Sequence, residues 1–410
     1  MDLVDIYHSA SAILLSCQSS WLNSNYLTVF VDKPELSLFQ KNNKLYLTDN
    51  IDVAEQTQKN PFDLIEHYLD KGYYALGYIG YDYLEFSDIN IKLRSKQCGN
   101  RFPQLYINFY KPDKLISFKK DEFEKINKII LNSNLAHTKP EINYSISKET
   151  YISNVNKIKE YIEAGDVYQV NISHLVRSEV KTDPKNIFLK YFSSQPVPYG
   201  IYINCDKFHF LGGSMELFVE KKDGLIKTKP VKGTSKRDKN LKSDHKLKLE
   251  LGNNLKERAE NLMIVDLMRN DLSRICKHET VKVNKLFDVK SYKTLHQMES
   301  EVTGQLKQNV RLKDIIYNIF PPGSVTGAPK KRSVEIIDEL EQHSRGPYCG
   351  CAGVFSPDGD FTLCVSIRTA ILADNIVNYW AGSGIVYDSD PIKEYKETLL
   401  KAEAFLTAIN

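Results

Sequence analysis

The segment from Leu217 to Lys229 constrains the fold most, because it consists of two strand-like runs on either side of Asp223-Gly224. An Asp-Gly pair between two such runs favours the tight turn of a β-hairpin. Other strand-like runs in the chain are also separated by short turns. Short turns favour antiparallel pairing, because parallel strands need a long crossover connection. The pattern therefore predicts an α+β protein with mostly antiparallel strands.

The change in these signals near residue 140 predicts two regions, residues 1–140 and 145–410, and the length allows one large domain or two closely joined lobes. Residues 1–140 are rich in Tyr, Phe and Leu and predict strands with a few helices, and polar residues at 134–148 predict a linker. Helices are expected over 151–164, over 238–275, after Pro329 and from Ser389-Asp390-Pro391 onward. Strands are expected at 26–31, 73–81, 166–177, 353–355, 361–372 and 376–382.

The composition excludes several classes of protein. The 410 residues include 55 Lys and Arg against 52 Asp and Glu, a formal charge of +3, and this near balance argues against binding to nucleic acid. No apolar run approaches the roughly 20 residues of a membrane span, and the N-terminus does not resemble a secretory signal. Seven scattered cysteines predict a reducing compartment, so we expect a cytoplasmic protein that is not associated with a membrane. Cys349-Gly350-Cys351 is interpreted as packing, because no second pair completes a metal site.

Lys232 is the residue that most strongly suggests chemistry. It stands between Pro230 and Gly233, and Glu216 precedes the predicted hairpin. The hairpin would bring Glu216 and Lys232 to the same end of a sheet. A carboxyl group beside an amine can combine proton transfer with nucleophilic attack, provided that part of the amine is neutral. The alternative is a surface Lys and Glu in a lysine-rich chain, and the pair alone leaves both readings open.

Two pairs of glutamates have helical spacing. Glu257 and Glu260 lie three residues apart, and Glu394 and Glu397 repeat the spacing, with Lys401 four residues further on. Each pair would lie on one face of its helix. If the two pairs face one another they need a cation, and carboxylate ligands favour a hard one such as Mg²⁺. The alternative is two ordinary solvated helix faces.

Two glycine-rich turns could bind anions. Residues 320–332 lead into a helix and contain the hydroxyls of Ser324 and Thr326, and Gly382-Ser383-Gly384 precedes the last helix. Arg368 lies in an apolar segment and would need an anionic partner if buried. His296 is isolated, and the first turn could also be a plain helix start. Together these features suit a small substrate with more than one carboxylate and a leaving group that a metal assists.

Five ordered motifs resemble the chorismate-utilising enzymes, which include anthranilate, aminodeoxychorismate, isochorismate and salicylate synthases. They are Glu257–Asp271, Gly323–Lys330, Arg368-Thr369, Gly382–Ile385 and Glu394–Thr398. The similarity is strong over residues 150–410 and loose over the first 140. It implies two facing, mostly antiparallel sheets with helices outside. It also implies an anthranilate synthase component I-like region over 1–140 and a chorismate-binding catalytic domain over 145–410, intertwined in one globule.

The resemblance also implies roles for individual residues. Glu260 and Glu397 would bind Mg²⁺ directly, and Glu257 and Glu394 would reach it through water. The residues implied to bind chorismate are Arg368 and Tyr348 for one carboxylate, Gly382, Ser383, Gly384 and Lys401 for the other, His296 and Thr326 for the ring, and Gln169, Gly233 and Thr234 around them.

Three positions indicate the branch of the family. Gln169 stands where the water-using members carry a lysine base, so ammonia is the expected nucleophile. Asn261 stands where anthranilate synthases typically have histidine, and Lys232 stands where they have alanine. The resemblance is therefore to aminodeoxychorismate synthase component I. It implies that Lys232 attacks chorismate at C2, with Glu216 as general acid, and that ammonia then adds at C4 on the route to para-aminobenzoate and folate.

Some positions depart from the family pattern. Met215 replaces the proline that usually precedes the glutamate. The segment 14–17 lacks the signature of tryptophan-inhibited anthranilate synthases. Gly350–Gly353 lacks the context of a glutaminase nucleophile, so a separate glutamine amidotransferase is expected to supply ammonia. The alternatives are anthranilate synthase component I, acting in tryptophan biosynthesis, and a non-catalytic homologue.

Overall fold

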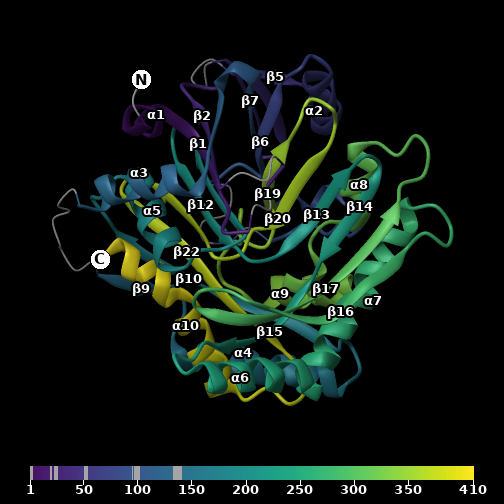
Figure 1. Ribbon diagram of the computed structural model, residues 1–410. Helices are drawn as coiled ribbons and strands as arrows, with labels where there is room; N and C mark the ends of the chain where they lie inside the picture. The colour runs from purple at the N-terminus through teal and green to yellow at the C-terminus, as the bar shows by residue number, and fades with distance from the viewer. Residues whose placement is uncertain are drawn as a thin grey trace.

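The computed structural model of the chain describes residues 3–410 apart from 19–20, 23–25, 50–53, 95, 97–101 and 133–140. Within these residues the strands form one sheet of ten strands and one of twelve (Figure 1). Every strand pair in the described chain is antiparallel. The predicted α+β class with antiparallel sheets is confirmed.

The elements have the following bounds. The ten-stranded sheet runs in the order β18 (Gly327–Ala328), β10 (Gln169–Glu179), β22 (Ile376–Ile385), β21 (Thr369–Ala373), β12 (His209–Ser214), β11 (Tyr199–Asn204), β1 (Ala10–Leu15), β2 (Leu27–Val31) and β8 (Leu115–Phe118), with β9 (Ile142–Tyr144) paired to β10. The twelve-stranded sheet runs in the order β15 (Val231–Lys236), β17 (Leu295–Gln305), β14 (Leu225–Lys229), β13 (Leu217–Lys222), β20 (Phe361–Val365), β19 (Cys351–Phe355), β6 (Tyr74–Ile79), β7 (Leu105–Tyr110), β3 (Leu36–Lys41), β4 (Lys44–Thr48) and β5 (Glu55–Thr57), with β16 (Lys282–Ser291) paired to β17. The helices are α1 (Leu3–Ser9), α2 (Pro61–Asp70), α3 (Lys120–Asn132), α4 (Lys148–Glu163), α5 (Pro184–Ser194), α6 (Leu241–Asn253), α7 (Leu255–Ile275), α8 (Leu312–Ile319), α9 (Lys330–Leu340) and α10 (Pro391–Ile409), and short 3-10 turns are η2 (Tyr81–Phe86), η3 (Pro112–Lys114) and η4 (Gly323–Val325).

The main core lies between the two sheets. Tyr78 of β6 stacks on Phe210 of β12 with ring centroids 5.3 Å apart. β1 is buried on both faces, because Ala12 and Leu14 join the core between the sheets, whereas the alternate residues on the strand join a second core with α5 and α10. These two helices lie beside β12 and β22 on one flank, and α7 lies beside β16 and β17 on the other (Figure 1).

Both predicted regions contribute strands to both sheets. β1, β2 and β8 from the first 140 residues extend the ten-stranded sheet, and β3 to β7 extend the twelve-stranded sheet. The chain is therefore interleaved across the two sheets, and the boundary near residue 140 stays a prediction. Of the predicted linker, 134–140 lies outside the described residues. β9 occupies 142–144 and α4 begins at residue 148, so a strand and a helix start replace part of the predicted linker.

The predicted hairpin is present as β13 and β14. Lys222 pairs with Leu225 across the turn, and Asp223 and Gly224 have φ of 50° and 75°. Positive φ at both turn residues matches the right-handed twist of the flanking strands, which is why an Asp-Gly pair occurs here. The turn places the residues before β13 and after β14 at the same end of the sheet.

Two predicted elements are each two elements. The helix expected over 238–275 is interrupted at Asn254, whose extended backbone (φ −68°, ψ 113°) ends α6 and whose side chain caps α7 by accepting from the Glu257 amide. The strand expected over 361–372 is interrupted between β20 and β21, where Arg368 has a φ of 54°. A continuous strand is not compatible with that left-handed residue.

Among the helices in the described part of the chain, none is both long enough and apolar enough to cross a membrane.

Candidate active site

Lys232 and Glu216 come together at the end of the hairpin. Glu216 is 5% exposed, and Lys232 lies on β15, one strand beyond β17 from β14. Part of Lys232 reaches solvent, but its Nζ is enclosed and donates to the backbone oxygen of Ser324 at 3.2 Å. Ser324 also hydrogen-bonds the carboxyl group of Glu216. The turn η4 therefore touches both residues of the predicted pair.

The environment shifts both groups toward their neutral forms. Burial raises the pKa of Glu216 to about 7, although Ser324, Lys232 and the Val231 amide each favour the carboxylate. Burial also lowers the pKa of Lys232, against the opposing effect of Glu260 and Glu216. A carboxyl group that keeps its proton near neutrality can act as an acid, and an amine with a lowered pKa is a better nucleophile.

Gln169 and Gly384 lie against the same amine. A Cβ placed on Gly384 would lie 2.8 Å from Nε2 of Gln169 and 3.3 Å from Nζ of Lys232. Both amide atoms of Gln169 are buried and without a hydrogen-bond partner among the described residues. Buried polar groups are usually paired, so the unpaired amide of Gln169 beside Lys232 marks a place for a polar ligand.

The second glycine-rich segment, Gly382 to Gly384, was predicted as a turn but lies within β22, where its residues pair with β10. A Cβ on Gly382 would lie 2.9 Å from Oη of Tyr348, and Nζ of Lys401 donates to the Gly382 carbonyl at 2.9 Å. Oγ of Ser383 lies 2.9 Å from Oη of Tyr151, a residue of α4 that the sequence motifs did not include. The glycine segment of β22, a phenol and an ammonium group therefore form one polar surface.

The four predicted carboxylates face one another from two helix starts. Burial raises the pKa of Glu257 and of Glu260, and Glu257 is also influenced by Glu397 and Glu394. A Cβ on Gly233 would lie 2.9 Å from Oε2 of Glu257, which places this cluster beside Lys232. The α10 pair is positioned by the cap of Asp390 on the amides of residues 392 and 393.

The carboxyl oxygens of the α10 pair have partners. Oε1 of Glu397 lies 2.6 Å from Nζ of Lys401, and Oε1 of Glu394 accepts from Ser389 at 2.7 Å. In the part of the chain that the structure describes, no three acidic, histidine or cysteine side chains converge as metal ligands. The donor set, all hard carboxylate oxygens, nonetheless fits Mg²⁺ rather than a softer metal, and lysines supply the opposing charge.

Arg368 differs from its prediction. We expected it to be buried in a strand with an anionic partner, but it is half-buried with left-handed backbone, and its Nη1 donates to the backbone oxygen of Lys401. It therefore lies next to the Lys401 backbone and not within β20 or β21.

His296 lies on the helix-covered face of β17. Its ring lies 3.0 Å from Asp244 of α6 and 2.9 Å from Ser291 of β16. Ser300 lies on the same face of this strand and hydrogen-bonds Asn261 of α7, the helix that carries Glu257 and Glu260. The role of His296 beside the ring therefore stays a prediction.

Two predicted threonines contribute little to the polar surface. The hydroxyl of Thr326 donates back to Pro322 and Gly323 within its own turn, and the side chain of Thr234 is exposed on β15. Ser324, which sequence reasoning noted only as a possible anion ligand, is the residue of this turn that contacts the Lys232 and Glu216 pair.

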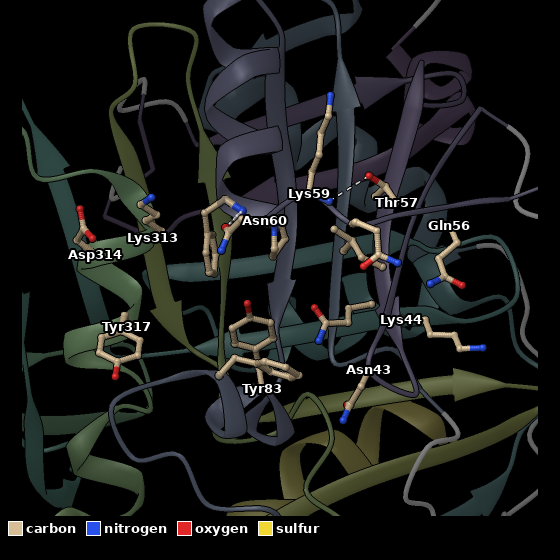
Figure 2. A pocket seen from close by; sticks show the side chains of 16 residues that line it. Asn43, Lys44, Gln56, Thr57, Lys59, Asn60, Tyr83, Lys313, Asp314 and Tyr317 are labelled. Atoms are coloured by element: carbon tan, nitrogen blue, oxygen red, sulfur yellow. Dashed lines mark hydrogen bonds between the residues drawn. The ribbon is translucent and has the colours of Figure 1, made fainter.

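A separate cavity of about 440 Å³ lies away from these residues (Figure 2). Its wall includes Asn43 and Lys44 at the turn between β3 and β4, Asn60 at the start of α2, and Tyr317 of α8. None of the predicted site residues lines it. The chemistry suggested by the sequence therefore belongs to the cluster around Lys232.

The fold agrees with comparisons to known proteins. The chain belongs to the chorismate binding enzyme family, whose profile it matches over residues 11–407. It is 36% identical to anthranilate synthase component 1 of Saccharolobus solfataricus over 82% of this chain and 80% of that one. It is 40% identical to aminodeoxychorismate synthase component 1 of Bacillus subtilis over 62% of this chain, which is 54% of that relative's length.

Solved structures share the architecture. Anthranilate synthase component I from Streptococcus pneumoniae superposes with a TM-score of 0.79 at 25% identity, covering 97% of this chain and 92% of that one. The menaquinone-specific isochorismate synthase from Escherichia coli has a TM-score of 0.72 at 16% identity, covering 100% of this chain and 92% of that one. The latter likeness concerns the fold alone.

Proposed function

We propose that this chain is component I of an aminodeoxychorismate synthase, which converts chorismate and ammonia to 4-amino-4-deoxychorismate. The observation that carries the proposal is the enclosed amine of Lys232, held by Ser324 beside Glu216. Burial of an amine costs free energy unless its charge is lost or paired. Direct addition of ammonia to chorismate has no use for such an amine, whereas a covalent lysine step requires it.

The proposed reaction has two steps. The neutral amine of Lys232 forms a bond to C2 of chorismate, the ring double bonds shift, and the C4 hydroxyl leaves as water with the proton of Glu216. Ammonia then bonds to C4, the double bonds shift back, and the C2–N bond to Lys232 breaks. The amine returns to Lys232 and a proton returns to Glu216, so that chorismate and ammonia give the product and water.

The remaining residues orient the substrate. The substrate carboxylates would be held by Tyr348, Lys401 and the segment of β22 from Gly382 to Gly384. Gln169 would face the incoming nucleophile. Glu257, Glu260, Glu394 and Glu397 would hold Mg²⁺, which when bound would assist departure of the C4 oxygen and order the ring carboxylate. Lysine contacts to these carboxylates would be replaced by the ion.

A glutamine amidotransferase is the proposed source of ammonia. The relatives from Saccharolobus solfataricus and Bacillus subtilis are each named as component 1 of their enzyme, which is consistent with a second component. The six cysteines of the described residues are all free, which suits the reducing cytoplasm in which we place the protein.

A second candidate is anthranilate synthase component I, acting in tryptophan biosynthesis. Relatives with that name include the proteins of Saccharolobus solfataricus and Aquifex aeolicus, at 36% and 40% identity. Two homologous enzymes that use the same substrate can differ in one nucleophile, so overall identity does not choose between them.

The product formed with ammonium separates the two candidates. Purified chain is incubated with chorismate, Mg²⁺ and ammonium, and the products are resolved by chromatography. We expect aminodeoxychorismate; fluorescent anthranilate from the unmodified chain would refute the proposal. Lys232→Ala should abolish or reroute amination at C4, and Lys236→Ala, an exposed lysine on the same strand, is the matched control. Wild-type formation of aminodeoxychorismate by Lys232→Ala would disprove the covalent step.

A further inference from the structure

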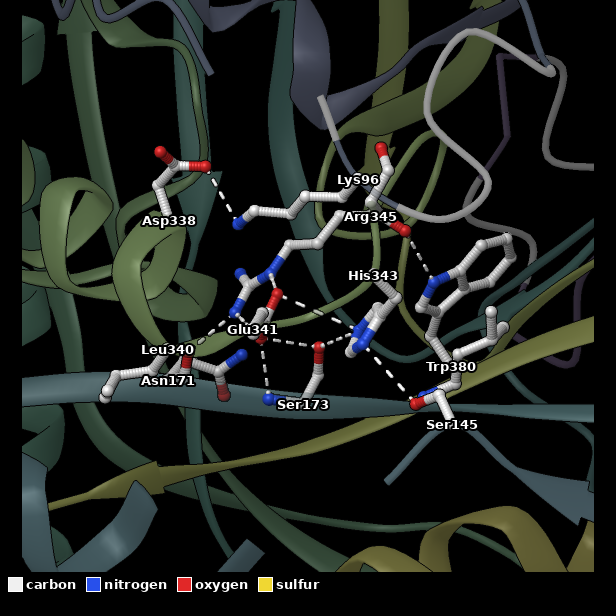
Figure 3. Close-up of polar contacts among 12 residues, drawn as sticks. Lys96, Ser145, Asn171, Ser173, Asp338, Leu340, Glu341, His343, Arg345 and Trp380 are labelled. Carbon is white, nitrogen blue, oxygen red and sulfur yellow. Dashed lines mark hydrogen bonds and ion pairs between the residues drawn. The ribbon is translucent and has the colours of Figure 1, made fainter. Parts of the chain in front are cut away.

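A buried ion pair lies behind the candidate site, outside all the residues discussed above. Glu341 follows α9, and Arg345 stands four residues later; the side chains of both are 1% exposed. Nε and Nη2 of Arg345 donate to the two carboxyl oxygens of Glu341 at 2.9 and 2.7 Å (Figure 3). Although burial alone would raise the pKa of Glu341, Arg345 holds it below its usual value. Both groups are therefore charged in the interior.

Arg345 has further donors, and they reach the turn that holds Lys232. Its Nη1 donates to the carbonyl of Val325 at 2.9 Å. Val325 follows Ser324, the residue that accepts from Lys232 and hydrogen-bonds Glu216. One guanidinium group thereby fixes the turn to which Lys232 and Glu216 both hydrogen-bond.

The same pair fixes the strand beside the glycine segment of β22. Nη2 of Arg345 donates to the carbonyl of Asn171 at 2.6 Å, and Oε1 of Glu341 accepts from the amide and hydroxyl of Ser173 at 2.8 and 2.7 Å (Figure 3). In the sheet, Asn171 pairs with Gly384 and Ser173 pairs with Gly382. The pair thus holds the part of β10 that pairs with this glycine segment.

The guanidinium group also lies close to two tyrosine rings. Cζ of Arg345 lies 4.8 Å from the ring centroid of Tyr81 and 6.0 Å from that of Tyr348. The second of these rings carries the hydroxyl beside Gly382. Only a planar group with five donors can meet two carbonyls, a carboxylate and aromatic rings together.

We propose that Arg345 and Glu341 are positioning residues for the reaction. A buried ion pair is weak evidence for a gain in stability, because desolvation offsets the attraction. This pair makes four additional hydrogen bonds to backbone and hydroxyl groups, all on segments next to the candidate site. Through Val325 it aligns Lys232 and Glu216, and through β10 it aligns the glycine segment of β22 for the chorismate carboxylate. The proposal rests on the use of chorismate, but not on which amino product forms.

The test separates the two branches by kinetics. Arg345→Lys keeps the charge and loses the fork, so kcat should fall about 100-fold, as expected for a misplacement near 1 Å of a catalytic group. Ser173→Ala removes one bond on the β10 side, so KM for chorismate should rise roughly three- to tenfold with kcat within twofold of the wild type. The measurement is consumption of chorismate, followed by the loss of its own absorbance with ammonium and Mg²⁺.

A second buried pair provides the control for simple loss of stability. Lys330 and Asp271 lie 2.7 Å apart with side chains 8% and 3% exposed, and Asp271→Asn should lower the unfolding temperature with little change in kcat or KM at 25 °C. The inference is overturned if folded Arg345→Lys keeps kcat and KM within twofold of the wild type, or if Asp271→Asn reproduces its kinetic loss. If the wild type itself consumes no chorismate, the proposed function fails instead.

Discussion

Replacing Glu216 with glutamine should make the protein more stable and less active. Burial raises the pKa of Glu216 from 4.5 to about 7, which corresponds to about 3 kcal/mol. Below pH 4.5 the group is protonated in both the folded and unfolded chains. As the pH rises from 4.5 through 7, the unfolded chain loses this proton first, so the free energy of unfolding of the wild type falls. Glutamine cannot ionise and avoids that loss.

Urea unfolding at pH 4 and at pH 8 measures the effect. The stability of Glu216→Gln relative to the wild type should rise by about 3 kcal/mol between the two pH values. Glu163→Gln, an exposed change on α4, should show no comparable rise. The chorismate reaction of Glu216→Gln should slow roughly 100-fold or more, as for loss of a general acid. A relative stability that is equal at both pH values would refute the argument that burial controls this carboxyl group.

Three further changes test other parts of the site and fold. Glu260→Gln should weaken Mg²⁺ binding at least about tenfold, measured by calorimetric titration; an unchanged titration would remove it from the ligand set. Gly384→Ala should raise KM for chorismate about tenfold or more, because the added Cβ would lie 2.8 Å from Gln169. A KM equal to that of the wild type would show that chorismate does not bind against Gly384. Asn254→Ala should lower the free energy of unfolding by about 1 kcal/mol through loss of the α7 cap. Asn254→Asp should retain most of the free energy of unfolding, because an aspartate can also cap a helix. Equal decreases in the two variants would argue against a capping role.

The sequence by itself was sufficient for the elements that depend on local chemistry. The Asp223-Gly224 turn, the cap of Asp390 with Pro391 at the start of α10 and the short connections between strands are set by neighbouring residues. Local patterns also placed each pair of glutamates on one helix face. These features follow from backbone preferences that a few adjacent residues decide.

Local patterns misjudged the elements that distant contacts decide. Asn254 can continue a helix or cap one, and the spacing around it does not distinguish the two. Arg368 looked like part of one apolar strand, yet its backbone turns there so that β20 can join one sheet and β21 the other.

The tertiary structure decided how the parts combine. Four separate segments supply the residues of the site, and only the pairing of the sheets brings them together. These residues are Lys232, Glu216, Gln169 and Gly384 of β22. The raised pKa of Glu216 and the lowered pKa of Lys232 exist because both groups leave water when the sheets close. The sequence carries no signal for the Glu341–Arg345 pair, because Arg345 donates to backbone carbonyls of residues that are distant along the chain. The sequence determined which groups were available, and burial between two sheets determined what each can do.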